Sequence, residues 1–350
     1  MIPILGKPVM EYLIEHLVSH GVREIMVNVS YLHQKIEEYF GDGHRFGAQI
    51  GYSFEGYMTN DGELHPEPIG SAGGMKKIHE FGGFFDETTL VICGDAIIDL
   101  DIAAALAEHR RKGAAASIVT KEVPREKTSE YGMVVADEQG RVLSFQEKPR
   151  PEAALSRLAS TGIYIFEPEI IDLIPSGRMF DIGSELFPLL IEKGVSFYAQ
   201  SRDFDWIDIG NVKDFWSVSQ SVLRGEVEHM VMPGTEIRPG IWTGLNVRID
   251  WTDTNIVGPV YIGSGTRIEA GSTVIGPTWI GHGSHICSGA EIGQSILFEY
   301  TRITPGTVMS EMVVCKDYCV SREGEMTHLT ESPDERWSDS RDRRTATRAG

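Results

Sequence analysis

The sequence predicts an α/β domain with a mostly parallel sheet, followed by a left-handed parallel β-helix. Two observations predict this fold class. In the first two thirds of the chain, helix-like and strand-like patterns alternate, which is typical of a parallel sheet covered by helices. Between residues 256 and 297, apolar residues recur at a constant spacing, with glycines between them.

The apolar repeat has a period of six. A helix places apolar residues every three to four positions and a half-buried strand every two, so neither explains this spacing. Short strands joined by tight turns do explain it, because each strand then places one side chain into a shared interior. The glycines supply corners with positive φ. The repeated positions are Ile256, Ile262, Ile268, Val274, Ile280, Ile286 and Ile292.

The alternating region predicts a Rossmann-like sheet interrupted by one hairpin, residues 133–146. The predicted helices cover residues 9–21, 32–40, 102–112, 182–193 and 212–223, and the other predicted strands cover 24–29, 48–54, 88–93, 114–120 and 160–166. We therefore expect an α/β domain over residues 1–224 and a β-helix over 225–320. Residues 321–350 mix both charge signs without an apolar period, and we expect them to be disordered.

Composition excludes several classes of function. The net charge of −19 argues against nucleic-acid binding, which needs a basic surface. It does not argue against a nucleotide ligand, because a metal ion can bridge acidic side chains and phosphates. No run of about 18 apolar residues predicts a membrane span, and no signal peptide is seen. The four cysteines are scattered, so we expect reduced thiols in a cytoplasmic protein.

Two acidic motifs lie beside apolar runs. Gly94-Asp95 follows the strand pattern of residues 88–93, and ligands bind beyond the carboxyl ends of parallel strands. Asp95 could therefore hold a metal, although an Asp that caps the next element is common. Asp208 lies in the run Trp206–Gly210, where a buried carboxylate is costly unless it is paired or bound to a metal. An N-cap or loop Asp is the alternative.

Two other motifs could bind a phosphorylated ligand. Glu147-Lys148 closes the hairpin, and these side chains can meet a hydroxyl and a phosphate, or form a plain exposed charge pair. The small residues of Glu67–Gly74 open a helix and allow close approach of a flat ligand. A simple Gly-rich helix start is the alternative, since no Walker lysine follows.

Taken in this order, the segments resemble the sugar-1-phosphate nucleotidyltransferases, also called NDP-sugar pyrophosphorylases, over roughly residues 1–320. The hexads resemble the β-helix of mannose-1-phosphate guanylyltransferase-like members. The matching segments are Pro3–Val9, Glu67–Gly73, Cys93–Asp95, Tyr131–Gly132, Phe145–Pro149, Thr161–Phe166 and Trp206–Gly210.

This resemblance implies transfer of a nucleotidyl group from a nucleoside triphosphate to a sugar 1-phosphate, with Mg²⁺ as cofactor. Asp95 and Asp208 are the implied metal ligands, and together with Lys148 the implied catalytic residues. Glu147 is implied to bind sugar hydroxyls, and Lys148 the sugar phosphate. The other implied substrate-binding residues are Gly132, Thr161 and Gly162 around the sugar, and Pro68, Gly70 and Ser71 against the base.

The family's N-terminal strand and Gly-rich loop with Gly-Thr-Arg are absent, because the chain opens at Met1-Ile2-Pro3. Loss of a triphosphate-binding loop removes charge stabilisation in the transition state. We therefore expect this chain to be inactive or nearly so, and a chain extended through the loop to be active.

The substrates are the least determined feature. The pattern is most similar to mannose-1-phosphate guanylyltransferase-like proteins, with a glucose-1-phosphate thymidylyl-, adenylyl- or uridylyltransferase as the alternative. A non-catalytic regulatory homologue that binds sugar nucleotides is a second alternative. A third is an acyltransferase that uses His282 or His285 of the repeat, although exposed histidines usually lie in turns or at the surface. We expect a homo-oligomer, because open strand edges need covering.

Overall fold

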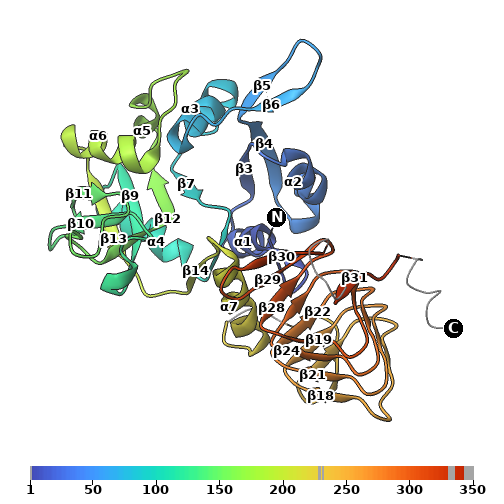
Figure 1. Cartoon of the computed structure of the whole chain (residues 1–350). Coiled ribbons are helices and arrows are strands. Elements are labelled where there is room, and N and C mark those ends of the chain that lie inside the picture. Colours follow the sequence, from blue (N-terminus) through green and yellow to red (C-terminus); the bar gives the residue numbers. More distant parts are fainter. Residues whose placement is uncertain (1, 228–229, 231, 330–335, 343–350) are drawn as a thin grey trace. The chain divides into compact units, whose positions relative to one another are not determined.

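The computed structural model describes residues 2–227, 230, 232–329 and 336–342 of the chain. Two compact units are present (Figure 1). The α/β unit contains Val9–Trp206, and the second unit contains Ile2–Pro8 together with the chain from Ile207 on. Among the residues that the structure describes, no helix is both long and apolar enough to cross a membrane.

The main sheet of the α/β unit is mixed. Strand β12 lies at its centre and runs antiparallel to β7, β9 and β10, while β13 runs parallel to β9 and β11 forms a hairpin with β10. Two further pairs stand apart: β3 with β4, parallel, and β5 with β6, antiparallel. The strands are β3 (Glu24–Val29), β4 (Gln49–Phe54), β5 (Gly56–Met58), β6 (Leu64–Pro66), β7 (Thr89–Ile92), β8 (Ala96–Ile98), β9 (Ala116–Glu122), β10 (Met133–Ala136), β11 (Val142–Gln146), β12 (Leu158–Phe166) and β13 (Phe197–Ser201).

Helices connect these strands, as the alternating pattern predicts. Several are capped in the expected way: Asp101 begins α4 by accepting a hydrogen bond from the Ala104 amide, and Gly83 ends α3 with φ of 66°. The helices are α1 (Val9–Ser19), α2 (His33–Phe40), α3 (Ser71–Gly82), α4 (Ile102–Arg111), α5 (Glu169–Asp172) and α6 (Phe187–Glu192), with short turns η1 (His44–Phe46), η2 (Arg125–Lys127) and the π-helical η3 (Ile182–Leu186).

The core of the α/β unit is rich in aromatic side chains. Phe187 is fully buried, and its ring lies 5.2 Å from that of Phe145, 5.3 Å from Tyr164 and 5.0 Å from Phe197. Since Phe145 belongs to the β10–β11 hairpin and Tyr164 to β12, this cluster joins the hairpin to the centre of the sheet.

The α/β class and the parallel β-helix are confirmed. The predicted hairpin is also present as β10 and β11. One difference from a mostly parallel sheet is the direction of β12, which opposes its three neighbours. Helix and strand periodicity does not reveal the direction of a strand in its sheet when a hairpin interrupts the alternation of strands and helices.

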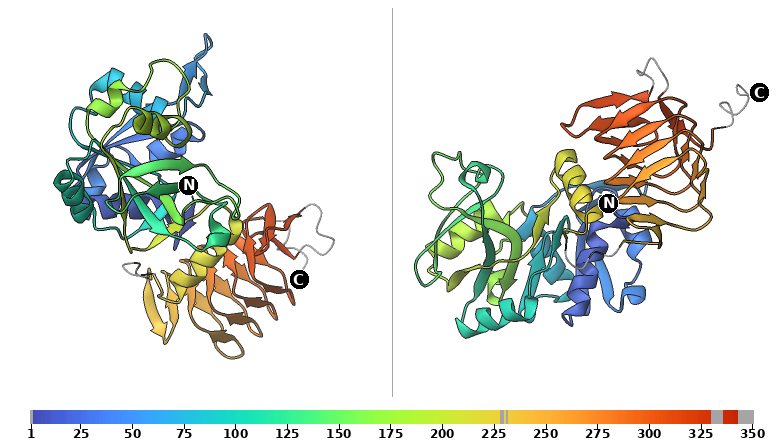
Figure 2. Two further views of the ribbon diagram at one scale, coloured as in Figure 1. Left: turned by 90° about the vertical axis from the view of Figure 1, so that its left-hand side faces the viewer. Right: turned by 90° about the horizontal axis from the view of Figure 1, so that it is seen from below.

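The second unit is a three-sided β-helix of short parallel strands (Figures 1 and 2). Its first side is extended at both ends by antiparallel strands. Side one contains β15 (Thr235–Arg238), β16 (Ile241–Thr243), β19 (Val260–Ile262), β22 (Thr278–Ile280), β25 (Ile296–Leu297), β28 (Met312–Val314), β29 (Tyr318–Ser321) and β30 (Met326–His328). Side two contains β17 (Arg248–Ile249), β20 (Arg267–Ile268), β23 (His285–Ile286), β26 (Thr301–Ile303) and β31 (Trp337–Asp339). Side three contains β18 (Asn255–Val257), β21 (Thr273–Ile275), β24 (Glu291–Gly293) and β27 (Val308–Ser310).

Strand pairing explains the period of six. Ile262 pairs with Ile280, 18 residues later, so three six-residue sides make one coil. The following coil has 17 residues, since Ile280 pairs with Leu297. This shortened coil ends the strict repeat at Ile292, but the stacking continues to Val314. The β-helix is therefore longer than the two coils that the strict repeat indicates.

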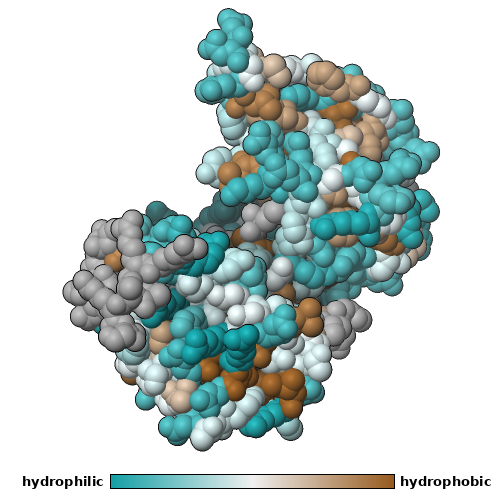
Figure 3. Space-filling view, turned by 90° about the vertical axis from the view of Figure 1, so that its right-hand side faces the viewer, coloured by the Kyte–Doolittle hydropathy of each residue, from teal (hydrophilic) through white to brown (hydrophobic). Residues whose placement is uncertain are grey.

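The repeated side chains form the interior of the β-helix. Six of the seven are nearly inaccessible, and Ile256 is partly buried against them. The surface of the β-helix is largely hydrophilic, but apolar residues also lie on it; Figure 3 shows such residues in brown among hydrophilic ones in teal. The large apolar residues exposed there include Ile237, Leu245, Val257, Ile275 and Val308. The expected homo-oligomer stays a prediction.

Two short segments outside the repeat complete this unit. Trp337 of β31 is buried in the β-helix interior, where β31 pairs with β26, so the prediction of disorder from residue 321 on is wrong for β30 and β31. An isolated aromatic residue in a polar segment gave no periodic signal. Residues 330–335 and 343–350 lie outside the described residues. At the other end of the chain, β1 (Pro3–Ile4) and β2 (Lys7–Pro8) form a small hairpin.

One strand and one helix lie where the chain passes from the first unit to the second. β14 (Trp206–Asp208) spans the boundary between them, and α7 (Val212–Leu223) belongs to the second unit. The indole Nε1 of Trp216 on α7 donates a hydrogen bond of 2.9 Å to the Gln294 carbonyl, so this helix lies against the β-helix.

Candidate functional site

Asp95 lies where the sequence places it, directly after the end of β7 and before the buried strand β8. Its side chain is exposed, and among the described residues no hydrogen-bond or ion-pair partner is found for its carboxylate. A hard cation such as Mg²⁺ takes one or two carboxylates and fills its remaining positions with water and phosphate. An exposed, unpaired carboxylate at a strand end fits that requirement.

The backbone beside Asp95 is held against β12. The Cys93 amide donates a hydrogen bond of 3.0 Å to the Gly162 carbonyl, and Gly162 has a φ of 72°. A Cβ at Gly162 would lie 2.7 Å from Cys93 Sγ, so only glycine fits there. Thr161 is buried and donates to the Val119 carbonyl at 2.9 Å. Thr161 and Gly162 therefore fix the register of β12 beside the Asp95 loop.

A second close approach positions the hairpin residues. A Cβ at Gly132 would lie 2.3 Å from the Phe145 ring, and one at Gly183 would lie 3.2 Å from the same ring. The Gly183 position is also 3.4 Å from Glu147 Oε2. The structure therefore packs Gly132, a predicted sugar-binding residue, against Phe145, and Gly183 lies near both Phe145 and Glu147.

Lys148 is exposed and has a φ of 42°. A non-glycine residue in the left-handed region costs backbone energy and often occurs at binding sites. Since Lys148 follows β11 directly, this conformation turns the chain at the point where the resemblance implies a sugar phosphate.

The Gly70–Ser71 segment is joined to the loop that begins η3. A Cβ at Gly70 would lie 2.5 Å from the Phe180 carbonyl oxygen, so the two backbones can approach only because this residue is glycine. The Ser71 hydroxyl donates a hydrogen bond of 2.8 Å to Asp181 Oδ2 and accepts one of 2.9 Å from the Ile182 amide. Pro68 lies in the exposed segment before α3.

Asp181 organises this loop as the N-cap of η3. Its Oδ1 accepts hydrogen bonds from the amides of Gly183 and Ser184 at 2.9 and 3.0 Å. Burial acts to raise the pKa of the Asp181 carboxyl, but the hydrogen bonds from Ser184, Ser71 and Gly183 outweigh it and hold the pKa below its usual value. The folded protein therefore stabilises the carboxylate form of Asp181.

Tyr164 connects these segments. Burial raises the pKa of its hydroxyl, and the neighbouring groups Cys93, Asp181 and Glu147 raise it further. The hydroxyl lies 3.3 Å from Ser160 Oγ. Cys93, Asp181 and Glu147 therefore lie near one partly buried tyrosine of β12, within the α/β unit.

Asp208 ends β14 and belongs to the second unit. It is half-buried and lies near the first turn of α7, since a Cβ at Gly210 would be 4.0 Å from Asp208 Oδ2 and 3.8 Å from Asp214 Oδ2. Asn211 is the N-cap of α7 and accepts a hydrogen bond from the Asp214 amide at 2.9 Å. Asp208 itself is therefore not the N-cap that the sequence left open as an alternative.

Sequence reasoning missed Asp181 and Tyr164. Asp181 is separated from Ser71 by 110 residues, and no motif in the sequence links them. The signal that could have found Asp181 is a capping pattern, because an Asp before Ile-Gly-Ser-Glu is typical of a helix start.

Comparison with known proteins identifies relatives that cover most of the chain. The family model described as nucleotidyl transferase matches residues 1–225. A UTP–glucose-1-phosphate uridylyltransferase of Synechocystis sp. is 54% identical over 324 residues, which is 93% of this chain and 83% of that protein. A mannose-1-phosphate guanylyltransferase of Mycobacterium tuberculosis is 29% identical, covering 78% of this chain and 76% of that protein.

Solved structures share the fold. The crystal structure of HddC from Yersinia pseudotuberculosis has a TM-score of 0.51 and 23% identity, and covers 63% of this chain and 88% of that chain. Its complex with GMP-PN gives the same TM-score at 24% identity. These likenesses support the fold of the matched region.

Proposed function

Because the chain belongs to the nucleotidyl transferase family, among the sugar-1-phosphate nucleotidyltransferases, we propose that it transfers the uridylyl group of UTP to glucose 1-phosphate. The products are UDP-glucose and pyrophosphate. The observation that carries this proposal is the 54% identity to the Synechocystis uridylyltransferase over 93% of the chain. Mannose-1-phosphate guanylyltransferase relatives are 29% to 32% identical, so the comparison favours the glucose alternative over the expected mannose substrate.

The proposed chemistry is an in-line displacement. A phosphate oxygen of glucose 1-phosphate attacks the α-phosphorus of UTP; the new P–O bond forms as the bond to the β-phosphate oxygen breaks, and pyrophosphate leaves. No covalent intermediate with the protein is needed, so the chain acts by positioning and charge neutralisation. Lys148 is proposed to pair with the sugar phosphate, and Glu147 to accept hydrogen bonds from sugar hydroxyls.

We propose Asp95 and Asp208 as the carboxylate ligands of Mg²⁺, which when bound neutralises phosphate charge. The lack of another partner for Asp95 among the described residues supports its part in this assignment. Ser71, Gly70 and Pro68 are proposed to lie against the base. The hydrogen bonds between Ser71 and the Asp181 loop support this role, because they hold the start of α3 in one conformation.

Gly132, Thr161 and Gly162 are proposed to border the sugar. Glycine at two of these positions lets the backbone pack directly against Phe145 and Cys93, where any Cβ would collide. A cytoplasmic location and the domain limits at residues 224 and 320 stay predictions.

A substrate panel tests the proposal. Pyrophosphate release is measured with UTP, GTP, dTTP and ATP, each combined with glucose 1-phosphate and with mannose 1-phosphate. The panel is run on the chain as printed and on the same chain extended with a family-type first strand and Gly-Thr-Arg loop. We expect the extended chain to prefer UTP and glucose 1-phosphate by at least about tenfold in kcat/KM, a difference of about 1.4 kcal/mol.

Preference for GTP and mannose 1-phosphate would overturn the proposed substrates. Tight binding of UDP-glucose by the extended chain without any turnover would instead support the non-catalytic alternative. Asp95→Asn, compared with the exposed Asp86→Asn as a matched control, separates loss of a site carboxylate from a general loss of charge.

A further inference from the structure

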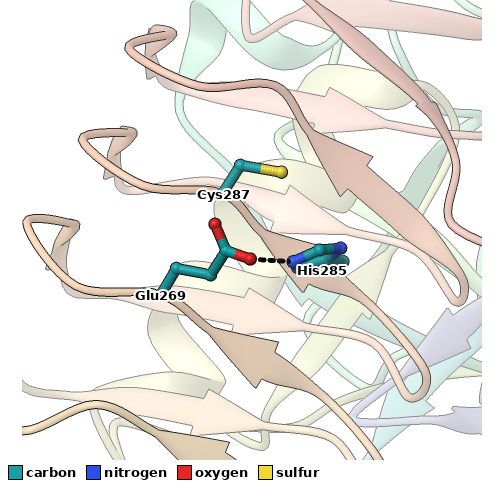
Figure 4. A group of neighbouring side chains, drawn as sticks. All are labelled: Glu269, His285 and Cys287. Atoms are coloured by element: carbon teal, nitrogen blue, oxygen red, sulfur yellow. Dashed lines mark hydrogen bonds and ion pairs between the residues drawn. The ribbon is translucent and has the colours of Figure 1, made fainter. Parts of the chain in front are cut away.

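A second group of polar side chains lies on the β-helix, outside the proposed transferase site (Figure 4). It contains Glu269, His285 and Cys287. β20 and β23 are parallel, with Arg267 opposite His285 and Ile268 opposite Ile286. Since alternate residues of a strand face the same side, His285 and Cys287 flank the inward Ile286, and Glu269 lies one coil below Cys287.

Hydrogen bonds orient the carboxylate of Glu269. Its Oε1 lies 2.9 Å from His285 Nε2, and its Oε2 accepts a hydrogen bond of 3.0 Å from the Ser288 amide. The backbone contact fixes one oxygen, so the other is directed toward the imidazole. Cys287 is almost inaccessible, and one ligand atom from each of the three residues lies within 4.8 Å of the others.

We propose that Glu269, His285 and Cys287 bind a zinc ion that joins adjacent coils of the β-helix. Carboxylate, imidazole and thiolate are the ligands that zinc uses in proteins, and bond lengths of about 2.0–2.3 Å place tetrahedral ligand atoms roughly 3.3–3.7 Å apart. The observed separation of the oxygen and nitrogen, 2.9 Å, is close to this, and the sulfur lies within 4.8 Å of both atoms. None of the three residues takes part in the proposed transferase site.

A neighbouring groove leaves room for the fourth ligand. Glu269 and Ser288 line an open groove of about 950 Å³, which also contains Arg248, Arg267 and Trp251. A water molecule entering from this groove can complete a tetrahedral site with three protein ligands. Binding displaces the proton of the Cys287 thiol, and a neutral His285 binds through Nε2 with its single proton on Nδ1.

Two guanidinium groups lie near the proposed ligands. Arg267 lies 3.3 Å from Glu269 Oε1, and Arg302 lies beside His285 on the next coil. Their positive charges oppose any cation, so a hard ion that gains little from sulfur and nitrogen ligands is disfavoured relative to zinc. Arg267 is mostly exposed, so its side chain can move into solvent when the metal binds.

Metal binding is tested on the whole chain after treatment with EDTA. Equilibrium dialysis against Zn²⁺ should give one tightly bound ion per chain, and Co²⁺ should give a thiolate-to-cobalt charge-transfer band. Cys287→Ala, His285→Ala and Glu269→Gln should each weaken zinc binding by more than about tenfold. Cys315→Ala removes another partly buried thiol and should leave binding unchanged.

The Arg267→Gln variant should change zinc affinity in the opposite direction. This distinguishes a metal site from a structural hydrogen-bond cluster. We expect this variant to bind zinc several-fold more tightly, because a repelling charge is removed. Thermal unfolding in EDTA establishes that each variant folds. Stoichiometric zinc binding that persists in the Cys287→Ala/His285→Ala double variant, or no zinc bound by the parent chain, would overturn the proposal.

Discussion

In the α/β unit, strand β12 pairs with segments far away along the chain, whereas in the β-helix each parallel strand pairs with the coil before it. Ile163 pairs with Ile92, and Tyr164 with Ile118. Ile268, in contrast, pairs with Ile286, one coil later. The proposed transferase site depends on the distant pairings, and the proposed zinc site on the adjacent ones.

This difference predicts how far the loss of stability from a substitution should spread in each unit. The α/β core joins hairpin, sheet and helices in one aromatic cluster, so a cavity there weakens every element at once. In a solenoid, each repeat contacts only its neighbours, and stability is approximately a sum of local terms. The effects of substitutions in the two units should therefore differ in how far they spread as well as in how much stability is lost.

The largest effect is expected from Phe187→Ala. Deletion of a fully buried ring that contacts three other aromatic rings should lower the free energy of unfolding of the α/β unit by about 3–5 kcal/mol. Urea denaturation combined with hydrogen exchange of peptides from each unit measures this loss. Phe81→Ala, at a side chain that is 85% exposed, is the control and should have little effect. An equal loss of protection throughout the β-helix would contradict the comparison.

Asp95→Ala should reduce catalysis without reducing stability. Removal of one group that stabilises developing charge typically costs on the order of 10²-fold in rate, about 2.7 kcal/mol. Steady-state kinetics of the extended chain measures kcat/KM, and thermal unfolding should stay unchanged because Asp95 is exposed. Full activity in Asp95→Ala would remove Asp95 from the proposed site.

Asp181→Ala should destabilise the α/β unit by about 1–2 kcal/mol at pH 7, because the N-cap of η3 is lost. The folded-state pKa of Asp181 lies below its unfolded value, so the charged carboxylate stabilises the fold above about pH 4. That contribution is lost as the pH falls through the folded-state pKa.

Chemical denaturation between pH 2 and 7 measures this dependence. Asp181→Asn keeps a capping oxygen and is the matched control: we expect most of the stability at pH 7 but a weaker dependence on acid pH than in the parent chain. If the Ala and Asn variants both retain the full acid dependence of the parent, Asp181 is not the group responsible.

The smallest effect is expected from Ile286→Val in the β-helix interior. Loss of one buried methylene costs about 0.5–1.5 kcal/mol. Hydrogen exchange should show reduced protection in the coils next to Ile286 and none in the α/β unit. Reduced protection spread evenly over both units would show that they unfold together.

Much of the secondary structure could be predicted because it depends on local patterns. The helix over residues 212–223 and the strand over 24–29 coincide with α7 and β3, and the repeat identified the interior of the β-helix. The direction of β12 and the burial of Trp337 could not be predicted, because neither leaves a periodic trace in the sequence.

The sequence by itself determined the fold class, the family resemblance and the residues that carry the expected chemistry. These depend on periodicity and on short motifs, which are properties of neighbouring residues. Only the tertiary structure decided which groups meet: Ser71 with Asp181, Gly162 with Cys93, and Glu269 with His285. Such pairs form because strand register and coil length bring separate segments together, and no local pattern encodes the partner of a side chain.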